Sequence, residues 1–262
     1  MTGAGRGPRR ATARIAAALL AAAVAPAALA YILPTGAILR GMAAKRAEAG
    51  IVSLEATGLL EASGPTAERV AQAAGLRTLG GRVAVTARFS LKVPGRCRIE
   101  LVPAGLAEAD RPFATVRDGA LAGRGLETSP AVAALLRSTC ALLAVAPVAG
   151  GSAAYAEALG RRGVALGAAS LGRFGGRITY VLGGRPSDPK PLVFVDKETL
   201  RPLRLLASEG GPLLDTRLVG WGSPVGGDWF PRAVEVHERD ALLLRFSAEK
   251  VVANPKLPDA IF

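Results

Sequence analysis

The chain has 262 residues and a formal net charge of +12, and its basic residues are scattered along the sequence rather than clustered. Aromatic residues make up 5% of the chain, and the predicted strands lack the paired surface aromatics that stack on bases. The composition therefore argues against a nucleic-acid-binding protein. A basic surface of this kind attracts anionic lipid or acidic protein instead.

The first thirty residues have the composition of an export signal. Four arginines without an acidic residue are followed by an alanine-, leucine- and valine-rich run, and residues 28–30, Ala-Leu-Ala, fit the small-x-small rule of signal peptidase. We expect residues 1–30 to be a signal peptide cleaved after Ala30, with release of the mature protein into a bacterial periplasm. The alternative is an uncleaved anchor, because residues 15–32 have the length of a short transmembrane helix, although Pro26 weakens it.

Residues 31–262 are long enough for one domain with its own hydrophobic core, and we expect this domain to be a monomer. Its first predicted element is a helix over 37–49, which Gly50 ends. A first strand is expected over 51–60. A polar, glycine-rich connection then runs through Gly81.

The clearest strand pattern of the chain lies over 83–93. Apolar residues alternate there with polar ones, Pro94-Gly95 turns the chain, and the alternation continues over 97–101. This alternation is typical of an antiparallel hairpin with one solvent-facing side. A second hairpin is expected over 115–122, with its turn at Asp118-Gly119.

Two helices are predicted in the middle of the chain. Ser129 has the residue type of an N-cap, Pro130 suits the first helical position, and apolar residues recur along one helical face up to Leu143. A second, shorter helix is expected over 153–159, and Gly160 ends it. We interpret this pair as a helical cover for the sheet.

Strand patterns resume after these helices, separated by short turns. They lie over 177–182, 192–195, 202–206, 216–221, 234–237 and 242–248. Roughly nine or ten strands, with helices only at the start and in the middle, predict a mainly β protein with helices (α+β). We expect one strongly curved antiparallel sheet with an apolar concave side, because a sheet of this length tends to curl or close.

The sequence supports no catalytic set, and we expect neither an enzyme nor a cofactor. His237 is the single histidine, so no Ser-His-Asp or Cys-His arrangement is indicated, and no residue cluster has metal-ligand spacing. By strand parity His237 shares an outward face with Glu235, which predicts a solvated surface histidine. Cys97 and Cys140 are a candidate disulfide in an oxidising compartment; the alternative is that both are small buried apolar residues.

The C-terminal half of the chain has a recognisable layout. A strand ending in Val193-Phe194-Val195-Asp196 leads through a turn to Pro202, Trp229-Phe230-Pro231 opens a new strand, and the last strand runs into Asn254-Pro255. Together with the leader, the Leu33-Pro34-Thr35-Gly36 start and the mid-chain helices, this layout resembles the LolA-type periplasmic outer-membrane lipoprotein carriers and their relatives.

The resemblance implies an unclosed β-barrel with a helical lid, whose hydrophobic cavity shields acyl chains. The expected function is that of a periplasmic carrier that brings lipoprotein acyl chains or another lipid to the outer membrane. A lipidated protein or a lipid would be the cargo, and an inner-membrane release complex and an outer-membrane acceptor would be the partners. Burial of each methylene contributes roughly 0.8 kcal/mol to such binding.

The carrier hypothesis places apolar residues of the sheet and of the helices around the cavity. They are Val85, Phe89, Ile99, Leu101, Tyr180, Phe194, Leu244 and Phe246 on the wall, with Val132, Leu136 and Leu143 under the lid. The alternative is that the same residues fill an ordinary core. A second function also stays open, a periplasmic sensor or envelope-assembly module that binds a protein partner through the same fold. An open cavity favours the carrier, whereas an exposed apolar patch favours the sensor.

Overall fold

The computed structural model describes residues 32–146 and 151–262. Residues Pro34–Phe262 form one compact unit, which holds the helices and strands described here. The predicted signal peptide and its cleavage point lie outside the described residues.

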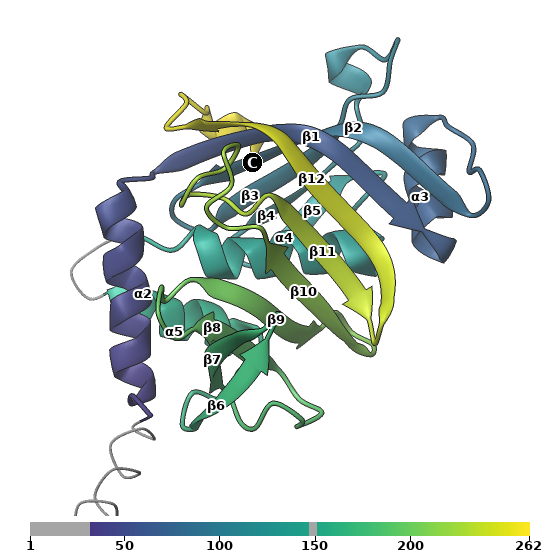
Figure 1. The fold of residues 1–262 in the computed structure, drawn as a ribbon. Coiled ribbons are helices and arrows are strands. Elements are labelled where there is room, and N and C mark those ends of the chain that lie inside the picture. The colour runs from purple at the N-terminus through teal and green to yellow at the C-terminus, as the bar shows by residue number, and fades with distance from the viewer. Residues whose placement is uncertain (1–31, 147–150) are drawn as a thin grey trace, which may run out of the picture. The chain divides into compact units, whose positions relative to one another are not determined.

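Twelve antiparallel strands form one sheet, in the order β5-β4-β3-β2-β1-β12-β11-β10-β9-β8-β7-β6 (Figure 1). The central pair β1 and β12 joins two runs of sequential strands, and β5 and β6 end the sheet without pairing with each other, so the sheet is unclosed. The strands are β1 (Ser53–Ser63), β2 (Arg82–Lys92), β3 (Arg96–Leu101), β4 (Phe113–Arg117), β5 (Ala120–Arg124), β6 (Ala169–Phe174), β7 (Arg177–Leu182), β8 (Leu192–Asp196), β9 (Pro202–Ser208), β10 (Leu213–Val219), β11 (Ala233–Glu238) and β12 (Ala241–Ala253).

The helices of this unit show how strongly the sheet is curved. The helices are α2 (Thr35–Ala49), α3 (Gly64–Ala74), α4 (Pro130–Leu143) and α5 (Gly151–Arg161). Helix α4 contacts β3 and β4 and also β9 to β12, although β1 and β2 lie between these two groups in the sheet. A flat sheet does not permit this, so the sheet curls around α4, as Figure 1 shows. Helix α5 packs on α4, and α2 packs on α5.

Helix α4 is the centre of the hydrophobic core. The helix begins as predicted, since the Ser129 hydroxyl accepts a hydrogen bond from the Val132 N–H at 3.5 Å and Pro130 is the first helical residue. Twelve of its 14 residues are buried, far more than the single apolar face expected from the sequence. The other faces carry small residues such as Ala133 and Ala141, which allow neighbouring elements to approach closely on every side.

The structure confirms most of the predicted strand pairing. The hairpin of β2 and β3 turns at Pro94-Gly95, that of β4 and β5 turns at Asp118-Gly119, and β7 pairs with β8. The predicted turn after β8 forms because the Asp196 carboxylate accepts hydrogen bonds from the backbone N–H groups of Glu198 and Thr199. These features follow from local sequence patterns, which explains why the sequence predicts them.

Two elements differ from the prediction. The polar, glycine-rich connection contains helix α3, whose buried residues Ala67, Val70, Ala71 and Ala74 repeat at helical spacing and pack toward β1, β2 and β12. Strand β6 was not expected either, and the described sheet has twelve strands, more than the nine or ten estimated from the sequence. The buried side chains of α3 are small, mostly alanines, and the residues of β6 are mostly half-buried, so neither element contains a run of large apolar residues.

The prediction of a solvated His237 is wrong. His237 shares a face with Glu235 as expected, and its Nε2 lies 3.0 Å from Glu235 Oε2, but the residue is only 8% exposed. Parity therefore gave the correct face for His237. It does not reveal that neighbouring side chains on that face, among them the carboxylate of Glu235, cover the imidazole ring.

Gly58 marks the closest approach in the central strand pair. The register between β1 and β12 shifts between Thr57 and Gly58, and a Cβ atom on Gly58 would overlap the carbonyl oxygen of Ser247. We expect Gly58→Ala to lower the free energy of unfolding by about 1–3 kcal/mol, since the backbone of β12 must move to admit a methyl group. Urea denaturation measures this change. Gly36→Ala is the control, because Gly36 is exposed in a helical turn where the new Cβ meets only the flexible end of Arg40, and its stability should be unchanged or higher.

Candidate functional site

All the residues that the sequence placed around a lipid cavity are buried. Each of the eleven is at most 5% exposed: Val85, Phe89, Ile99, Leu101, Val132, Leu136, Leu143, Tyr180, Phe194, Leu244 and Phe246. Most lie on the concave side of the sheet or on α4, where they pack together.

An aromatic cluster fills the concave side beneath the central strands. The ring of Phe230 lies 5.5 Å from that of Phe89 and 6.4 Å from that of Phe246, and the last two are 6.1 Å apart. All three are fully buried. Phe230 comes from the loop before β11, and the sequence offered no periodic pattern that would assign it to this cluster. The interior is therefore occupied by side chains at this point.

Phe194 lies on the opposite side of the sheet from Tyr180. Tyr180 pairs with Val195, and Phe194 pairs with Val181, so the two aromatic residues point to different faces. Phe194 packs with Phe174 on the outer face, their ring centroids 6.1 Å apart, and the Arg204 guanidinium lies 4.9 Å from the Phe194 ring. The structure thus separates Phe194 from the other predicted cavity residues.

A cavity of about 700 Å³ lies beside the C-terminal half of α4. It is bounded by α4, α5 and three turns, those between β2 and β3, between β4 and β5, and between β9 and β10. Small and apolar side chains form much of its wall: Val116, Cys140, Ala141, Ala144, Val145 and Ala158. None of the eleven predicted residues lines this cavity.

Charged side chains also line the cavity. They are Asp118, Arg137, Glu157, Arg161, Arg162 and Glu209. Glu209, in the turn between β9 and β10, accepts hydrogen bonds from Arg137 Nη1 at 2.6 Å and from Arg162 Nη2. Its side chain is only 3% exposed. One carboxylate therefore connects α4, the end of α5 and the β9–β10 turn at the wall of the cavity.

The C-terminal end of α4 is capped by two buried polar side chains. Arg46 of α2 donates to the Leu143 carbonyl at 2.7 Å and to the Trp229 carbonyl at 3.1 Å, and it is 8% exposed. Tyr155 of α5 donates to the Leu142 carbonyl at 3.1 Å. Burial lowers the pKa of Arg46 and raises the pKa of Tyr155 to about 12. The positive charge of Arg46 lies at the negative, C-terminal end of the α4 dipole, which is a favourable arrangement. Both side chains donate hydrogen bonds to carbonyls that no helical N–H reaches. A second cavity of about 470 Å³ adjoins Arg46 and Tyr155.

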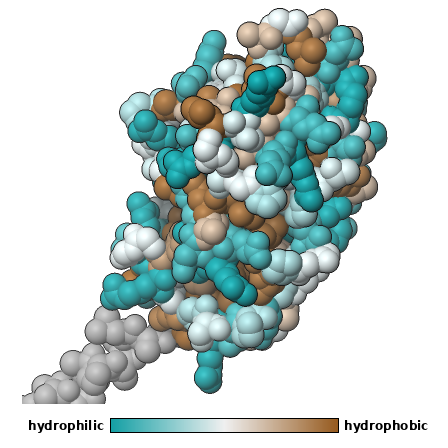
Figure 2. Space-filling model, turned by 90° about the vertical axis from the view of Figure 1, so that its right-hand side faces the viewer, coloured by the Kyte–Doolittle hydropathy of each residue, from teal (hydrophilic) through white to brown (hydrophobic). Residues whose placement is uncertain are grey.

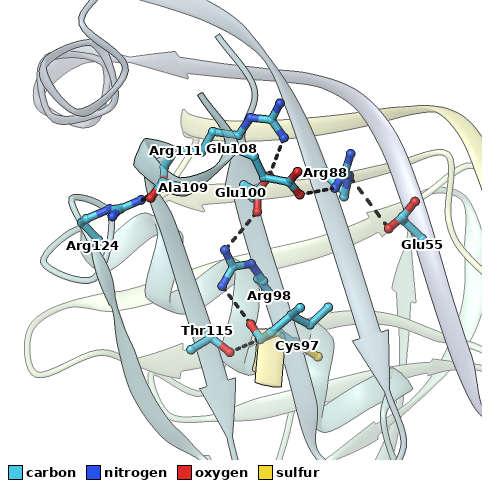
Figure 3. Close-up of polar contacts among 11 residues, drawn as sticks. Glu55, Arg88, Cys97, Arg98, Glu100, Glu108, Ala109, Arg111, Thr115 and Arg124 are labelled. Carbon is cyan, nitrogen blue, oxygen red and sulfur yellow. Dashed lines mark hydrogen bonds and ion pairs between the residues drawn. The ribbon is translucent and has the colours of Figure 1, made fainter. Parts of the chain in front are cut away.

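The outer face of β2 and β3 carries a network of ion pairs (Figure 3). Glu100 accepts hydrogen bonds from Arg98 at 2.9 Å and from Arg111 at 3.2 Å. Arg98 also stacks 3.8 Å above the centre of the Phe113 ring and donates to the Ile261 carbonyl at 2.8 Å. These contacts fasten the C-terminal segment to the outside of the sheet, away from α4, and we assign them a structural role.

Cys97 and Cys140 are both buried free thiols. Burial raises the pKa of Cys97, and so does the Cys140 thiol, which lies close enough to hydrogen bond to it. The structure thus brings together a strand residue and a helix residue that are far apart in the sequence. The disulfide between them stays a prediction.

The described part of the chain contains neither a cluster of metal-binding side chains nor a membrane-spanning helix. Within it, no group of three or more His, Cys, Asp or Glu side chains is placed to hold a metal ion. Across residues 32–146 and 151–262, no helix combines the length and apolar character needed to span a membrane.

Comparison with known proteins gives likenesses among solved structures. No protein-family model and no curated protein matches the chain. It is similar to a LolA superfamily protein from Nitrosomonas europaea, at 13% identity and a TM-score of 0.46, over 88% of this chain and 98% of that one. An outer membrane lipoprotein-sorting protein domain from Vibrio parahaemolyticus is similar at 11% identity and a TM-score of 0.41, over 85% and 96% of the two chains. A DUF1329 family protein from Desulfovibrio piger is similar at 12% identity and a TM-score of 0.41, over 88% of this chain and 98% of that one.

Removal of Arg46 tests the cap of α4. We expect Arg46→Met to lower the free energy of unfolding by about 1–3 kcal/mol, since the Leu143 carbonyl loses its charged donor while staying buried. Thermal or urea denaturation measures the change. Arg40→Met is the matched control because Arg40 is exposed on the same helix. An equal effect of the two substitutions would contradict the role assigned to Arg46.

The predicted disulfide is tested by thiol counting. In protein exported to an oxidising compartment and denatured in an alkylating reagent without reductant, we expect neither Cys97 nor Cys140 to be labelled. A thiol oxidase there removes two electrons and two protons as the sulfur–sulfur bond forms. Intact mass measures the labels, and a Cys140→Ala variant, which should take one label, is the control. Two labels on the exported wild-type protein would refute the bridge.

Proposed function

We propose that this protein binds an acyl chain in the cavity beside α4 and carries it through the bacterial periplasm. The observation that carries the proposal is the cavity itself, about 700 Å³ in volume, with small apolar side chains along α4 and α5. This volume lies within the range of pockets that hold small ligands. Burial of an alkyl chain against such a wall is favourable by roughly 0.8 kcal/mol per methylene.

The fold supports this location for the ligand. The curved sheet and the helices that it encloses hold the cavity wall in place, because α4 is fastened by its burial and by the cap that Arg46 and Tyr155 provide. The sequence-predicted residues of the concave face pack against α4. We propose that a ligand first contacts the residues that line the cavity. It would reach the concave face of the sheet only if α4 moved away from that face.

The sequence supports the compartment and the partners that we propose. The composition of residues 1–30 is that of an export signal, and the C-terminal layout resembles that of the lipoprotein carriers. We therefore propose that the protein receives a lipid or lipidated protein from an inner-membrane release complex and delivers it to an outer-membrane acceptor. Such a carrier needs no catalytic group.

A second candidate function rests on the end strand β5. β5 is the edge strand at one end of the open sheet, and four of its five residues are exposed. An exposed strand edge accepts a strand of another protein by backbone hydrogen bonding, which a sensor or envelope-assembly module would use.

On the face seen in Figure 2, hydrophilic side chains are interspersed with hydrophobic ones. That surface is the kind expected of a carrier whose apolar binding site lies inside.

Filling the cavity tests the carrier proposal. Ala154 of α5 lines the cavity and is half-buried, whereas its neighbour Ala153 is exposed and lies outside it. We expect Ala154→Trp to weaken binding of a fluorescent long-chain fatty acid by about tenfold or more, equivalent to about 1.4 kcal/mol, because the indole occupies the space of the alkyl chain. Fluorescence titration measures the affinity. Ala153→Trp is the matched control and should bind like the wild type.

Two results would count against the proposal. One is a wild-type protein that does not bind the fatty acid at all. The other is equal binding by Ala154→Trp and Ala153→Trp, which would place the ligand elsewhere on the protein. Circular dichroism and thermal unfolding of both variants show whether each has the wild-type fold.

A further inference from the structure

The buried charges at the cavity wall are not balanced. Glu209 carries one negative charge and is hydrogen bonded to both Arg137 and Arg162, each of which carries one positive charge. The exposed fractions of these side chains are 3% for Glu209, 10% for Arg162 and 29% for Arg137. This group, which we call the arginine pair with its carboxylate, therefore has one excess positive charge in a region partly removed from water.

The other charged residues of the wall compensate this excess only weakly. Glu157 and Arg161 form an ion pair with each other, and their side chains are 72% and 45% exposed. Asp118 is exposed in its turn. Water and salt screen exposed charges strongly, whereas charges partly removed from water are screened much less. The electrostatic potential at the buried end of this wall is accordingly set by Arg137, Arg162 and Glu209.

The arginine pair also has more donors than its carboxylate has acceptor sites. Two guanidinium groups offer ten N–H donors, and a carboxylate accepts about four hydrogen bonds. Among the described residues, the Nε atoms of both Arg137 and Arg162 are buried without a hydrogen-bond partner. A group with excess positive charge and excess donors is suited to an additional anion, and a planar guanidinium matches carboxylate or phosphate oxygens.

The apolar wall continues from this charged group. Arg137 lies on α4 one helical turn before Cys140 and Ala141, and all three line the cavity. An anion bound by the arginine pair would therefore have alkyl-sized apolar space directly beside it. Charge and apolar surface meet within one cavity, which is the arrangement that an amphiphile requires.

We infer that the cavity binds amphiphiles with an anionic head, a carboxylate or a phosphate, which pairs with Arg137 and Arg162 while the alkyl chain lies against Cys140, Ala141 and Ala144. This inference rests on the proposed function and specifies its ligand. It also gives Glu209 a distinct role. The carboxylate positions both arginines and neutralises one of their two positive charges. The remaining positive charge gives the site its preference for an anionic ligand.

Neutral and anionic ligands of equal chain length test the inference. Palmitate and hexadecyl phosphate carry the anionic head, hexadecanol carries a neutral one, and inorganic phosphate carries no chain. For the full-length protein we expect both anionic amphiphiles to bind at least about tenfold more tightly than hexadecanol, and inorganic phosphate not to compete at equal concentration. Isothermal titration or displacement of a fluorescent fatty acid measures the affinities.

Two substitutions in the same ion-pair group should act in opposite directions. Arg137→Gln removes a positive charge and should weaken palmitate binding by about tenfold, whereas Glu209→Gln removes the competing carboxylate and should strengthen it about threefold or more. Hexadecanol binding should change little in either variant. If the ion pairs only held the elements together, both substitutions would weaken every ligand alike. Arg137→Lys keeps the charge and should restore most of the preference.

The controls separate this inference from the proposed function. Arg173→Gln makes the same charge change at an exposed residue outside both cavities and should leave all affinities unchanged. Equal binding of palmitate and hexadecanol, unaffected by the substitutions, would overturn the anionic-head inference while the carrier proposal stands. No binding of any amphiphile would overturn both. Competition by inorganic phosphate as strong as that by hexadecyl phosphate would show a free-phosphate site and overturn the amphiphile assignment. Thermal unfolding confirms that each variant is folded.

Discussion

The structure depends on the burial of one apolar helix inside an open sheet. Twelve of the 14 residues of α4 are buried, and strands from both halves of the sheet contact it. A single sheet cannot bury its own apolar face, so α4 supplies the opposing surface and the sheet curls to reach it from several sides. The ends of α4 are satisfied by Ser129 at its start and by Arg46 and Tyr155 at its end. The rest of the core, including the cluster around Phe89, fills the space that remains.

The two halves of α4 have different surroundings. The half nearer Ser129 is packed within the sheet, whereas Cys140 and Ala141 face a cavity whose other helical wall is α5. Two cations lie around this second half, the buried Arg46 at the helix end and the partly exposed Arg137 on the helix itself. The ligand site that we propose therefore lies where an unfilled volume adjoins the ion pairs of Glu209.

Much of the fold was predictable from local patterns, and the exceptions have physical causes. The alternation over β2 and β3 and the turn at Pro94-Gly95 predict a hairpin correctly, because strand parity and turn geometry depend on adjacent residues. Helix α3 was missed because its buried side chains are mostly alanines. Parity placed His237 on the correct face but did not reveal that the residue is buried there. For the candidate site, the sequence identified Cys140 only as a possible disulfide partner of Cys97. It did not identify Arg137 and Arg162, which line the cavity.

The sequence by itself determined the class of the protein: an antiparallel sheet with an apolar side and a pair of helices in the middle of the chain. The export signal in residues 1–30 stays a prediction from composition. Only the tertiary structure decided which apolar residues fill the interior and which face a cavity. Alternation and helical spacing follow from backbone geometry between near neighbours, whereas an unfilled volume depends on the summed sizes of side chains from distant segments. Phe230 enters the core from a loop, and Glu209 reaches two arginines on other elements, because the fold brings these distant segments together.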